Sequence, residues 1–480
     1  MSKLAGTVAL IVILAGVGFA STSYWAGMQA EHRYQEDLAK LSKNSELSEL
    51  KISTARYERG IFSSRAVTRV ESAQLENEDG STTNPSFSIL QEIYHGPIPF
   101  AGRGVAGISL APCLAVIRAT LDTESSEWTQ KLAKLYGDQE PLTVISQLGF
   151  DGSSDNYIEM PPLALQDVED LKDLKFSGLQ GYFRVAAKNT AVKGNLNISS
   201  LEIVGKTADG AETTPDDLAK ITLRDLAAFA DQYKGDFDLM FGDSGFKIGE
   251  LDIQAQNEAH PVIMSGLTIT GSMNQQTPKQ VTFDMLFNAD KIVIDQHSGT
   301  GNLKINVSNL DGATVQQIQQ WQDKMGNQPQ NALAMMEVLP ILKRLLDGKP
   351  TVSLTSQGNT SDGQWQSELT LEFQSPGNFT PAQNFSQFLK ALHKGKAHIV
   401  VSKKLVETVM TQSITNELRM KNPQLDDAQL GERAVKQTQQ RLQGFSMMGF
   451  IELDNDQYKS TARFENGKLF INTKEIPLTL

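Results

Sequence analysis

Gly301-Asn-Leu-Lys-Ile305 is a short run of alternating apolar and polar residues, and its pattern recurs along the chain. The same Gly-polar-Leu-x-Ile order stands at residues 194–198, 249–253 and 467–471. Alternation puts leucine and isoleucine on one face and the polar residues on the other, as a half-buried strand requires. We predict that each glycine marks the turn or bulge where a strand begins. Either a repeated strand unit or ordinary recurrence of strand patterns explains why the same phrase occurs at four places.

Alternation continues through most of the chain after residue 49, for example in 291–295, 351–355 and 369–373. Asn466-Gly467 lies between two such runs, which is the strongest short-range signal for a β-hairpin. Antiparallel sheets commonly keep one face in solvent, and this gives strands of alternating polarity. The predicted fold class is therefore α+β and β-rich, with a long, mainly antiparallel twisted sheet.

Two helical blocks interrupt the strands. The first block spans residues 313–350 and ends at Asp347-Gly348-Lys349-Pro350, a glycine-then-proline terminator. The second runs from Lys403 to about Met448 and is divided near Asn422-Pro423, with Leu405, Val409 and Met410 on one face. Such apolar stripes are more typical of faces packed on a sheet than of grooves for a partner.

The N-terminal segment carries no charged residue from Leu4 to Ala30. A helix that spans a membrane needs about 20 apolar residues, and Tyr24 and Trp25 suit the membrane–water boundary. We expect one uncleaved transmembrane helix, from Leu4 to about Ala26, within an anchor over residues 1–27. A cleaved signal peptide is the alternative, because Gly18-Phe19-Ala20 resembles a cleavage site.

The amino group and Lys3 favour a cytoplasmic N-terminus with the rest of the chain translocated. We expect a helical stalk over residues 28–48 and a β-rich region over 49–312. The C-terminal strands and helices, residues 351–480, are expected to belong to the same domain outside the cytoplasm.

Net charge and the position of the single cysteine argue against a nucleic-acid-binding protein and against a lipoprotein. The chain has 44 Lys and Arg against 56 Asp and Glu, a formal net charge of −12 that would repel nucleic acid. Cys113 is the single cysteine, so it forms no internal disulfide, and its position excludes an N-terminal lipoprotein anchor. We interpret it as a small buried hydrophobe.

Gly242-Asp243-Ser244-Gly245 echoes the nucleophile segment of chymotrypsin-like proteases. Phe246 replaces the second glycine of that motif, and no matching histidine segment precedes it, so the triad requirement fails. The alternating residues on either side favour a hairpin turn. We predict no catalytic residue here.

Metal and cofactor motifs are also lacking in the sequence. None of the six histidines stands in a His-Glu-x-x-His pattern, and Gly102 to Gly107 lacks the spacing of a dinucleotide fingerprint. Asp454-Asn455-Asp456 begins like a calcium loop, but Lys459 stands where the glycine belongs, so we predict an exposed turn. We expect no metal site, no cofactor and no enzymatic activity.

The stretch from Tyr57 to Ser64 contains an aromatic residue, a fixed cation and a glycine beside two hydroxyls. We predict a bent strand in which Gly60 forms the bend, Tyr57 and Phe62 pack on the sheet, and Arg59 pairs with a carboxylate or backbone carbonyls. Alternatively, Arg59 and the hydroxyls of Ser63 and Ser64 engage a phosphate or carboxylate of a ligand or partner.

Tyr57-x-Arg59-Gly60-x-Phe62-Ser63-Ser64, followed by His95-Gly96-Pro97, resembles the YdgA-like family of bacterial envelope proteins, a domain of unknown function. Gly149-Phe-Asp-Gly152-Ser153-Ser154 and the Asn466-Gly467 hairpin are similar to that family as well. The resemblance extends over nearly the whole chain. It implies a protein of the bacterial inner membrane, facing the periplasm and able to form a homodimer, and it implies no reaction or cofactor.

Two functions remain open at this point. The first is a non-enzymatic envelope scaffold or protein-interaction module, which the well-populated polar strand faces favour slightly. The second is a lipid- or hydrophobe-binding module with a sheet-lined groove, in a layout similar to AsmA-like envelope proteins. The expected partners are inner-membrane lipid at the N-terminal helix, a second copy of the chain, and an envelope protein or phospholipid.

Overall fold

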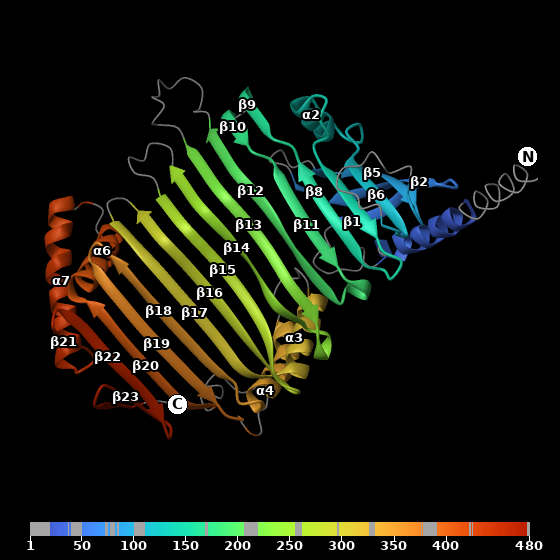
Figure 1. Ribbon diagram of the computed structural model, residues 1–480. Helices are drawn as coiled ribbons and strands as arrows, with labels where there is room; N and C mark the ends of the chain where they lie inside the picture. The colour runs from blue at the N-terminus through green and yellow to red at the C-terminus, as the bar shows by residue number, and fades with distance from the viewer. Residues whose placement is uncertain are drawn as a thin grey trace, which may run out of the picture. The chain divides into compact units, whose positions relative to one another are not determined.

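The computed structural model describes residues 20–36, 38–39, 50–72, 75–76, 82–83, 86–99, 111–168, 171–205, 219–254, 262–294, 297–325, 332–375, 377, 391–421, 424 and 426–477. It is a β-rich α+β protein, as the alternating sequence predicts. In these ranges 22 strands belong to antiparallel sheet, and β3 (Leu75–Glu76) and β4 (Thr82–Thr83) form a separate ladder. Figure 1 shows the elements with the labels used below.

The chain divides into two compact units. The N-terminal unit comprises residues 1–206, 224–235 and 320–329, and the C-terminal unit comprises residues 207–223, 236–319 and 330–480. Strand β13 (Lys220–Lys234) contributes residues to both units. Each unit is described by itself.

The N-terminal unit begins with a helix over residues 20–36. Its strands pair in the spatial order β1–β2–β5–β6–β7–β8–β11–β12–β10–β9. The bounds are β1 Leu50–Arg59, β2 Ser63–Ser72, β5 Ser86–His95, β6 Ala115–Leu121, β7 Thr143–Leu148, β8 Ser154–Met160, β9 Leu163–Val168, β10 Leu171–Phe176, β11 Leu179–Val185 and β12 Ala191–Gly205. Helix α2 (Glu127–Tyr136) and a 3₁₀ turn (Ala187–Asn189) lie between strands.

The N-terminal helix packs on this sheet through its smallest residues. Ser23, Ala26, Gly27 and Ala30 recur with helical spacing, and all four are buried. They form a narrow stripe along one face of the helix, and small side chains let its backbone approach the strands closely. Below them, the core of the unit contains Ala66, Ile93 and Ala115.

The predicted anchor lies largely outside the described residues, because residues 1–19 are not described. Among the helices that the structure does describe, none is both long enough and apolar enough to cross a membrane. Of the expected stalk, residues 28–36 belong to the helix packed on the sheet, and residues 40–49 are not described.

The C-terminal unit contains β15, the longest of the described strands. The strands of this unit pair in the order β14–β15–β16–β17–β18–β19–β20–β22–β23–β24, and β21 also pairs with β22. The bounds are β14 Met240–Gln254, β15 Val262–Thr277, β16 Gln280–Ile294, β17 His297–Asp311, β18 Thr351–Thr360, β19 Gly363–Phe373, β20 Leu392–Ser402, β21 Glu452–Asp454, β22 Gln457–Glu465, β23 Lys468–Ile471 and β24 Lys474–Ile476.

Both predicted helical blocks are present in this part of the chain. The first contains α3 (Gly312–Met325) and α4 (Ala332–Asp347), which ends at the predicted terminator. The second contains α6 (Lys403–Lys421) and α7 (Asp427–Met447), separated where Asn422-Pro423 predicts the division. In the C-terminal unit, α4 lies toward one end of the long strands and α6 and α7 toward the other (Figure 1).

Two predicted turns are confirmed. Asn466-Gly467 joins β22 to β23 with both residues at positive φ, as a tight hairpin requires. Asn455 and Asp456 also have positive φ and join β21 to β22.

The hairpin turn predicted at Gly242 to Gly245 is wrong. These residues lie inside β14 and pair with β15, with Ser244 opposite Gly271. Gly245 is needed for close packing rather than for a turn, because a Cβ there would collide with the backbone of Ile269 and Thr270. The chain turns before β14, in a short 3₁₀ segment over Asp236–Asp238.

The recurring Gly-polar-Leu-x-Ile phrases are strands, but three of their glycines do not begin one. Gly194, Gly249 and Gly301 stand within β12, β14 and β17, so this part of the prediction is wrong. Gly301 borders an irregularity in the pairing of β16 with β17, between Ala289 and Ile292. Strand glycines of this kind accommodate bulges and bulky neighbours.

Candidate functional sites

Three of the sequence motifs, at residues 57–64, 95–97 and 149–154, meet at the helix over residues 20–36. We call this region the helix-docking site, and it consists of that helix, the turn between β1 and β2, residues 95–97 and the loop between β7 and β8. It lies wholly within the N-terminal unit.

The turn between β1 and β2 contains Gly60, Ile61 and Phe62. Gly60 donates its backbone N–H to the carbonyl of Ser63 over 2.8 Å, and a Cβ at Gly60 would stand 2.7 Å from that oxygen. The predicted bend is therefore a hairpin turn. Phe62 differs from the prediction, since it is 47% exposed at the tip instead of packed on the sheet.

Arg59 ends β1 and reaches the docked helix. Its guanidinium donates to Glu31 Oε2 over 2.6 Å and to the hydroxyl of Tyr24 over 3.3 Å. The same guanidinium carbon lies 5.1 Å from the centre of the Tyr24 ring, within the range of a cation–π contact. Arg59 thus has a carboxylate partner inside its own chain, and it joins the turn to the helix.

Tyr57 packs on the helix from the strand side. Its ring lies 5.4 Å from that of Tyr34, and Tyr34 shares a hydrogen bond of 2.8 Å with Thr68. Burial is the main cause that raises the pKa of Tyr57. Along β2, Ser64, Ala66 and Thr68 are buried on one face, as their alternation predicts.

Ser64 and His95 form a buried pair. Ser64 Oγ lies 2.8 Å from His95 Nε2, and His95 Nδ1 lies 2.9 Å from the carbonyl oxygen of Ile61. A carbonyl oxygen can only accept, so Nδ1 carries the proton and Nε2 accepts from the serine hydroxyl. Burial lowers the pKa of His95, which favours this neutral form.

The pair contains the atoms of a nucleophile and a base, but its surroundings differ from those of a catalytic triad. Ser64 and His95 are each 2% exposed, and Gly27 of the helix lies against the imidazole ring. The atom that orients His95 is a backbone carbonyl instead of a carboxylate. We interpret the pair as a structural contact that fixes the hairpin turn beneath the helix.

Gly96 and Pro97, which follow His95 in the chain, pair with the segment at Cys113 and Leu114. The Gly96–Pro97 peptide bond is cis. Gly96 N–H donates to the carbonyl of Leu114 and Cys113 N–H donates to that of Pro97, over 2.8 and 2.9 Å. A Cβ at Gly96 would overlap the Cys113 carbonyl oxygen, so the two chain segments can be this close only with glycine. Cys113 is buried, and burial raises the pKa of its thiol.

The loop between β7 and β8 contacts the helix further along. Arg33 donates to the carbonyl oxygen of Gly152. Asp151 holds the loop by accepting from the N–H and hydroxyl of Ser153 over 2.9 and 2.7 Å, and these hydrogen bonds lower the pKa of Asp151. A hollow of about 470 Å³ lies between this loop and the helix, lined by both basic and acidic side chains.

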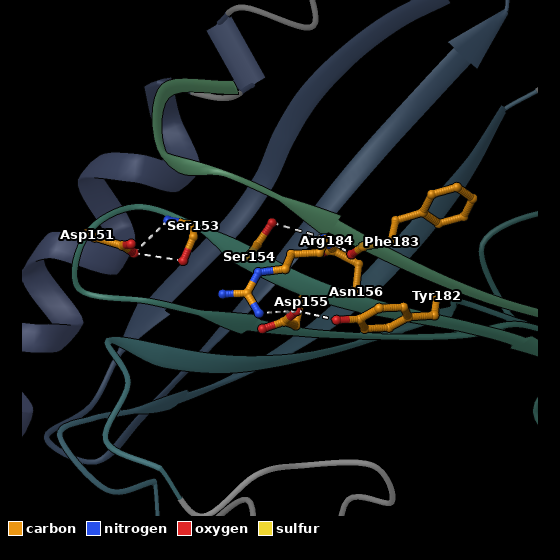
Figure 2. A network of polar contacts seen from close by, with 8 residues as sticks. All are labelled: Asp151, Ser153, Ser154, Asp155, Asn156, Tyr182, Phe183 and Arg184. Carbon is orange, nitrogen blue, oxygen red and sulfur yellow. Dashed lines mark hydrogen bonds and ion pairs between the residues drawn. The ribbon is translucent and has the colours of Figure 1, made fainter. Parts of the chain in front are cut away.

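Beyond the loop, a polar network crosses from β8 to β11. Figure 2 shows the Tyr182 hydroxyl donating to Asp155 over 2.6 Å, with the Arg184 guanidinium 4.0 Å from the same carboxylate. The hydrogen bond to Asp155 is the main cause that raises the pKa of Tyr182. Asn156 donates to the carbonyl of Phe183 over 3.1 Å. These contacts join β8 directly to β11, so the network fixes the register of the two strands.

A second candidate site lies in the C-terminal unit, where the sheet is strongly two-faced. On one face, directly opposed apolar residues form a row from β16 to β20: Met285, Ile305, Leu354, Leu369 and Ala397. On the other face the corresponding row from β16 to β19 is amide-bearing: Asn288, Asn302, Gln357 and Gln366. The two faces explain the alternation of apolar and polar residues in Gly301-Asn-Leu-Lys-Ile305.

Helix α6 and the apolar face of the sheet line an open groove of about 770 Å³, which we call the α6 groove. Eight of its eleven lining residues are apolar, and Arg441 is the one charged residue among them. The lining residues are Thr360, Trp365, Ile399, Val401, Leu405, Val406, Val409, Met410, Ser413, Ile414 and Arg441. The volume falls within the roughly 300–1,000 Å³ typical of small-molecule sites.

Trp365 forms part of the groove wall and is held in place. Its indole N–H donates to Ser356 Oγ over 3.0 Å. The ring lies so close over Gly358 that a Cβ there would overlap it, whereas a Cβ at Gly301 would be 3.9 Å away. The glycine at 358 therefore makes room for the tryptophan.

A family model described as a bacterial protein of unknown function (DUF945) matches residues 1–479. The chain belongs to this family. A search of curated proteins finds no match. The family description carries no activity, so the two sites above are the basis for a function of this DUF945 member.

In the part of this DUF945 chain that the structure describes, no three His, Cys, Asp or Glu side chains gather as a metal-binding group.

His297 and Lys404 both contact Asp362, over 3.3 and 2.8 Å. The Lys404 hydrogen bond is the main cause that lowers the pKa of Asp362.

Sequence reasoning found the strand side of the helix-docking site and missed the helix side. Glu31, Arg33, Tyr34 and Gly27 were not identified as partners of the motif residues. One signal was available, because Ser23, Ala26, Gly27 and Ala30 have the spacing of a single helix face. The α6 groove was missed for another reason: Leu405, Val409 and Met410 were assigned only to a face packed on the sheet, and between α6 and the sheet they also line a groove.

Proposed function

We propose that this DUF945 member is a membrane-anchored, non-enzymatic binding module that holds the aliphatic chain of an amphiphile in the α6 groove. The observation that carries the proposal is the groove itself, with eight apolar lining residues and one cation. An acyl chain would remove the apolar lining from water at roughly 25 cal/mol per Å². Lipid binding is one of the two functions that the sequence leaves open.

The charge of the groove specifies the amphiphile further. Arg441 projects from α7 and contacts Glu417 across 3.3 Å, with both side chains nearly half exposed. Exposed ion pairs of this kind contribute little, so Arg441 is able to exchange Glu417 for a ligand carboxylate or phosphate. We infer a single-chain anionic amphiphile, with its chain along α6 and its head group at Arg441.

Membrane attachment completes the proposal. The uncharged run from Leu4 to Ala30 supports an inner-membrane anchor with the bulk of the chain periplasmic. The resemblance to YdgA-like envelope proteins supports the same location. A module anchored beside a bilayer would have amphiphiles within reach.

Binding is tested with the full-length chain, stripped of lipid and titrated with a fluorescent stearic acid. Val409, 57% exposed, lines the groove, and Met420, 81% exposed, lies on the same helix outside it. Val409→Asp should weaken binding about tenfold or more, because a carboxylate in an apolar groove is costly, and Met420→Asp should leave it unchanged. Equal effects of the two substitutions, or no saturable binding, would contradict the proposal.

The head group is tested with Arg441→Gln. The variant should bind oleate more weakly than the natural chain and should bind methyl oleate equally well, because only the first ligand carries a charge. Loss of affinity for both would show that Arg441 supports the helix instead of the ligand.

The scaffold function remains the second candidate. Met420 and Met447 are each 81% exposed on α6 and α7, and exposed methionines are typical of adaptable protein-binding surfaces. Native mass spectrometry of the purified chain separates the two. Copurified phospholipid or fatty acid supports the binding module, and a lipid-free dimer supports the scaffold.

A further inference from the structure

We propose that the turn between β1 and β2 is a second membrane contact, in which Ile61 and Phe62 enter the lipid interface beside the N-terminal helix. The inference rests on the membrane anchor of the proposed function. It gives a role to the exposed side chains of Ile61 and Phe62, which lie in the stretch from Tyr57 to Ser64.

The turn presents apolar side chains outward while its backbone is held inward. Ile61 and Phe62 are 52% and 47% exposed. The carbonyl oxygens of both residues contact His95. Its Nδ1 lies 2.9 Å from the carbonyl oxygen of Ile61, and its backbone N–H donates to the carbonyl oxygen of Phe62 over 2.9 Å. A single residue thus fixes both peptide groups, so the two side chains project from a rigid support.

The turn lies beside the part of the helix that the sequence places at the membrane boundary. Arg59, the residue before Gly60, contacts both Tyr24 and Glu31. His95, directly behind the turn, lies against Gly27. Tyr24 and Trp25 are 42% and 48% exposed, and aromatic residues of this kind favour the interface.

Burial along the helix locates the boundary more closely. Ser23 and Ala26 are fully buried on the N-terminal unit, so the packed protein begins at Ser23. The uncharged residues before it, 4–22, are about as many as a spanning helix needs. With the bilayer ending near residue 22, a turn that contacts residues 24–27 lies at the lipid surface, where an exposed apolar tip is stabilised.

The consequence is a fixed orientation of the N-terminal unit on the membrane. A single helix permits rotation about its axis and tilting, whereas a second contact at the hairpin restricts both. The rigid links from Arg59 to Glu31 and from His95 to Ile61 would transmit that constraint to the sheet.

The test places the full-length chain in phospholipid nanodiscs with an environment-sensitive fluorophore at one introduced cysteine. Phe62→Cys labels the tip. Trp128→Cys is the matched control, because Trp128 is 42% exposed and packs on Phe87 at the other end of β5. Phe87 and His95 are eight positions apart along the strand, which is about 26 Å. The natural chain measures the labelling background of Cys113, which is buried.

We expect the label at residue 62 to show blue-shifted emission, quenching by spin-labelled lipid and protection from iodide. The label at residue 128 should show the reverse. A chain that enters the nanodisc but exposes residue 62 to iodide, with no response to spin-labelled lipid, overturns this inference and leaves the anchor intact. A chain that does not enter the nanodisc refutes the anchor itself, and the inference with it.

Discussion

Gly27 lies directly against the imidazole ring of His95: a Cβ at Gly27 would stand 2.6 Å from Nδ1 and 2.9 Å from Nε2 of that ring. Both nitrogens are already engaged, by the Ile61 carbonyl and by Ser64. The ring therefore cannot move aside without losing a hydrogen bond. This contact joins the N-terminal helix to buried residues of β2 and β5.

Gly27→Ala should destabilise the protein for this reason. Gly431→Ala is the control, since Gly431 lies in α7 with open space where its Cβ would be. Replacing a helical glycine with alanine normally stabilises by about 0.5–1 kcal/mol, so Gly431→Ala should raise the melting temperature and Gly27→Ala should lower it. Shifts of the same sign in both variants would show that the contact with His95 is loose.

His95 should make stability depend on pH. Burial lowers its pKa in the folded state, so the unfolded chain binds more protons near neutral pH. The stabilisation is fully present above the unfolded pKa of about 6.5 and is lost as the pH falls below it. Denaturant unfolding between about pH 5.5 and 8 should show this loss, and His95→Gln should reduce the slope. An unchanged slope in the variant would assign the effect to other groups.

Arg59→Ala should lower the unfolding free energy by about 0.5–1.5 kcal/mol, through loss of the Glu31 ion pair and the Tyr24 contact. Arg59→Lys should recover only part, because lysine lacks the planar fork. Arg56→Ala is the control, as Arg56 is 68% exposed and pairs with Glu58 along the same strand. A stable but inactive Arg59→Ala chain would instead indicate that Arg59 contacts a ligand or partner.

Gly358→Ala should destabilise the C-terminal unit and weaken binding in the α6 groove, because the added Cβ would overlap both the Trp365 ring and the carbonyl oxygen of Thr300. Gly301→Ala, on the neighbouring strand, places its Cβ in ordinary contact with the same ring and should be tolerated. Thermal unfolding and fatty-acid titration of the two variants provide the measurement. Equal behaviour of the pair would exclude Trp365 as a fixed wall of the groove.

The helix-docking site illustrates how far residue patterns reach. Ser64, Ala66 and Thr68 alternate, so their common buried face could be predicted from the strand period alone. The partner of Arg59 could not, because Glu31 is 28 positions away and many carboxylates stand at comparable separations. Phe62 shows the same limit: its alternation is that of a buried strand residue, but the strand ends at Arg59 and resumes at Ser63.

The local patterns of this sequence determined the strand periodicity, both helical blocks and the Asn466-Gly467 hairpin. Each of these depends on interactions between residues close in the chain, whose spacing is fixed by backbone geometry. Tertiary structure decided that Gly27 would meet His95, and that Leu405 and Val409 would line a groove. Those contacts depend on which elements pack together and how closely, and neither is set by the period of a single element.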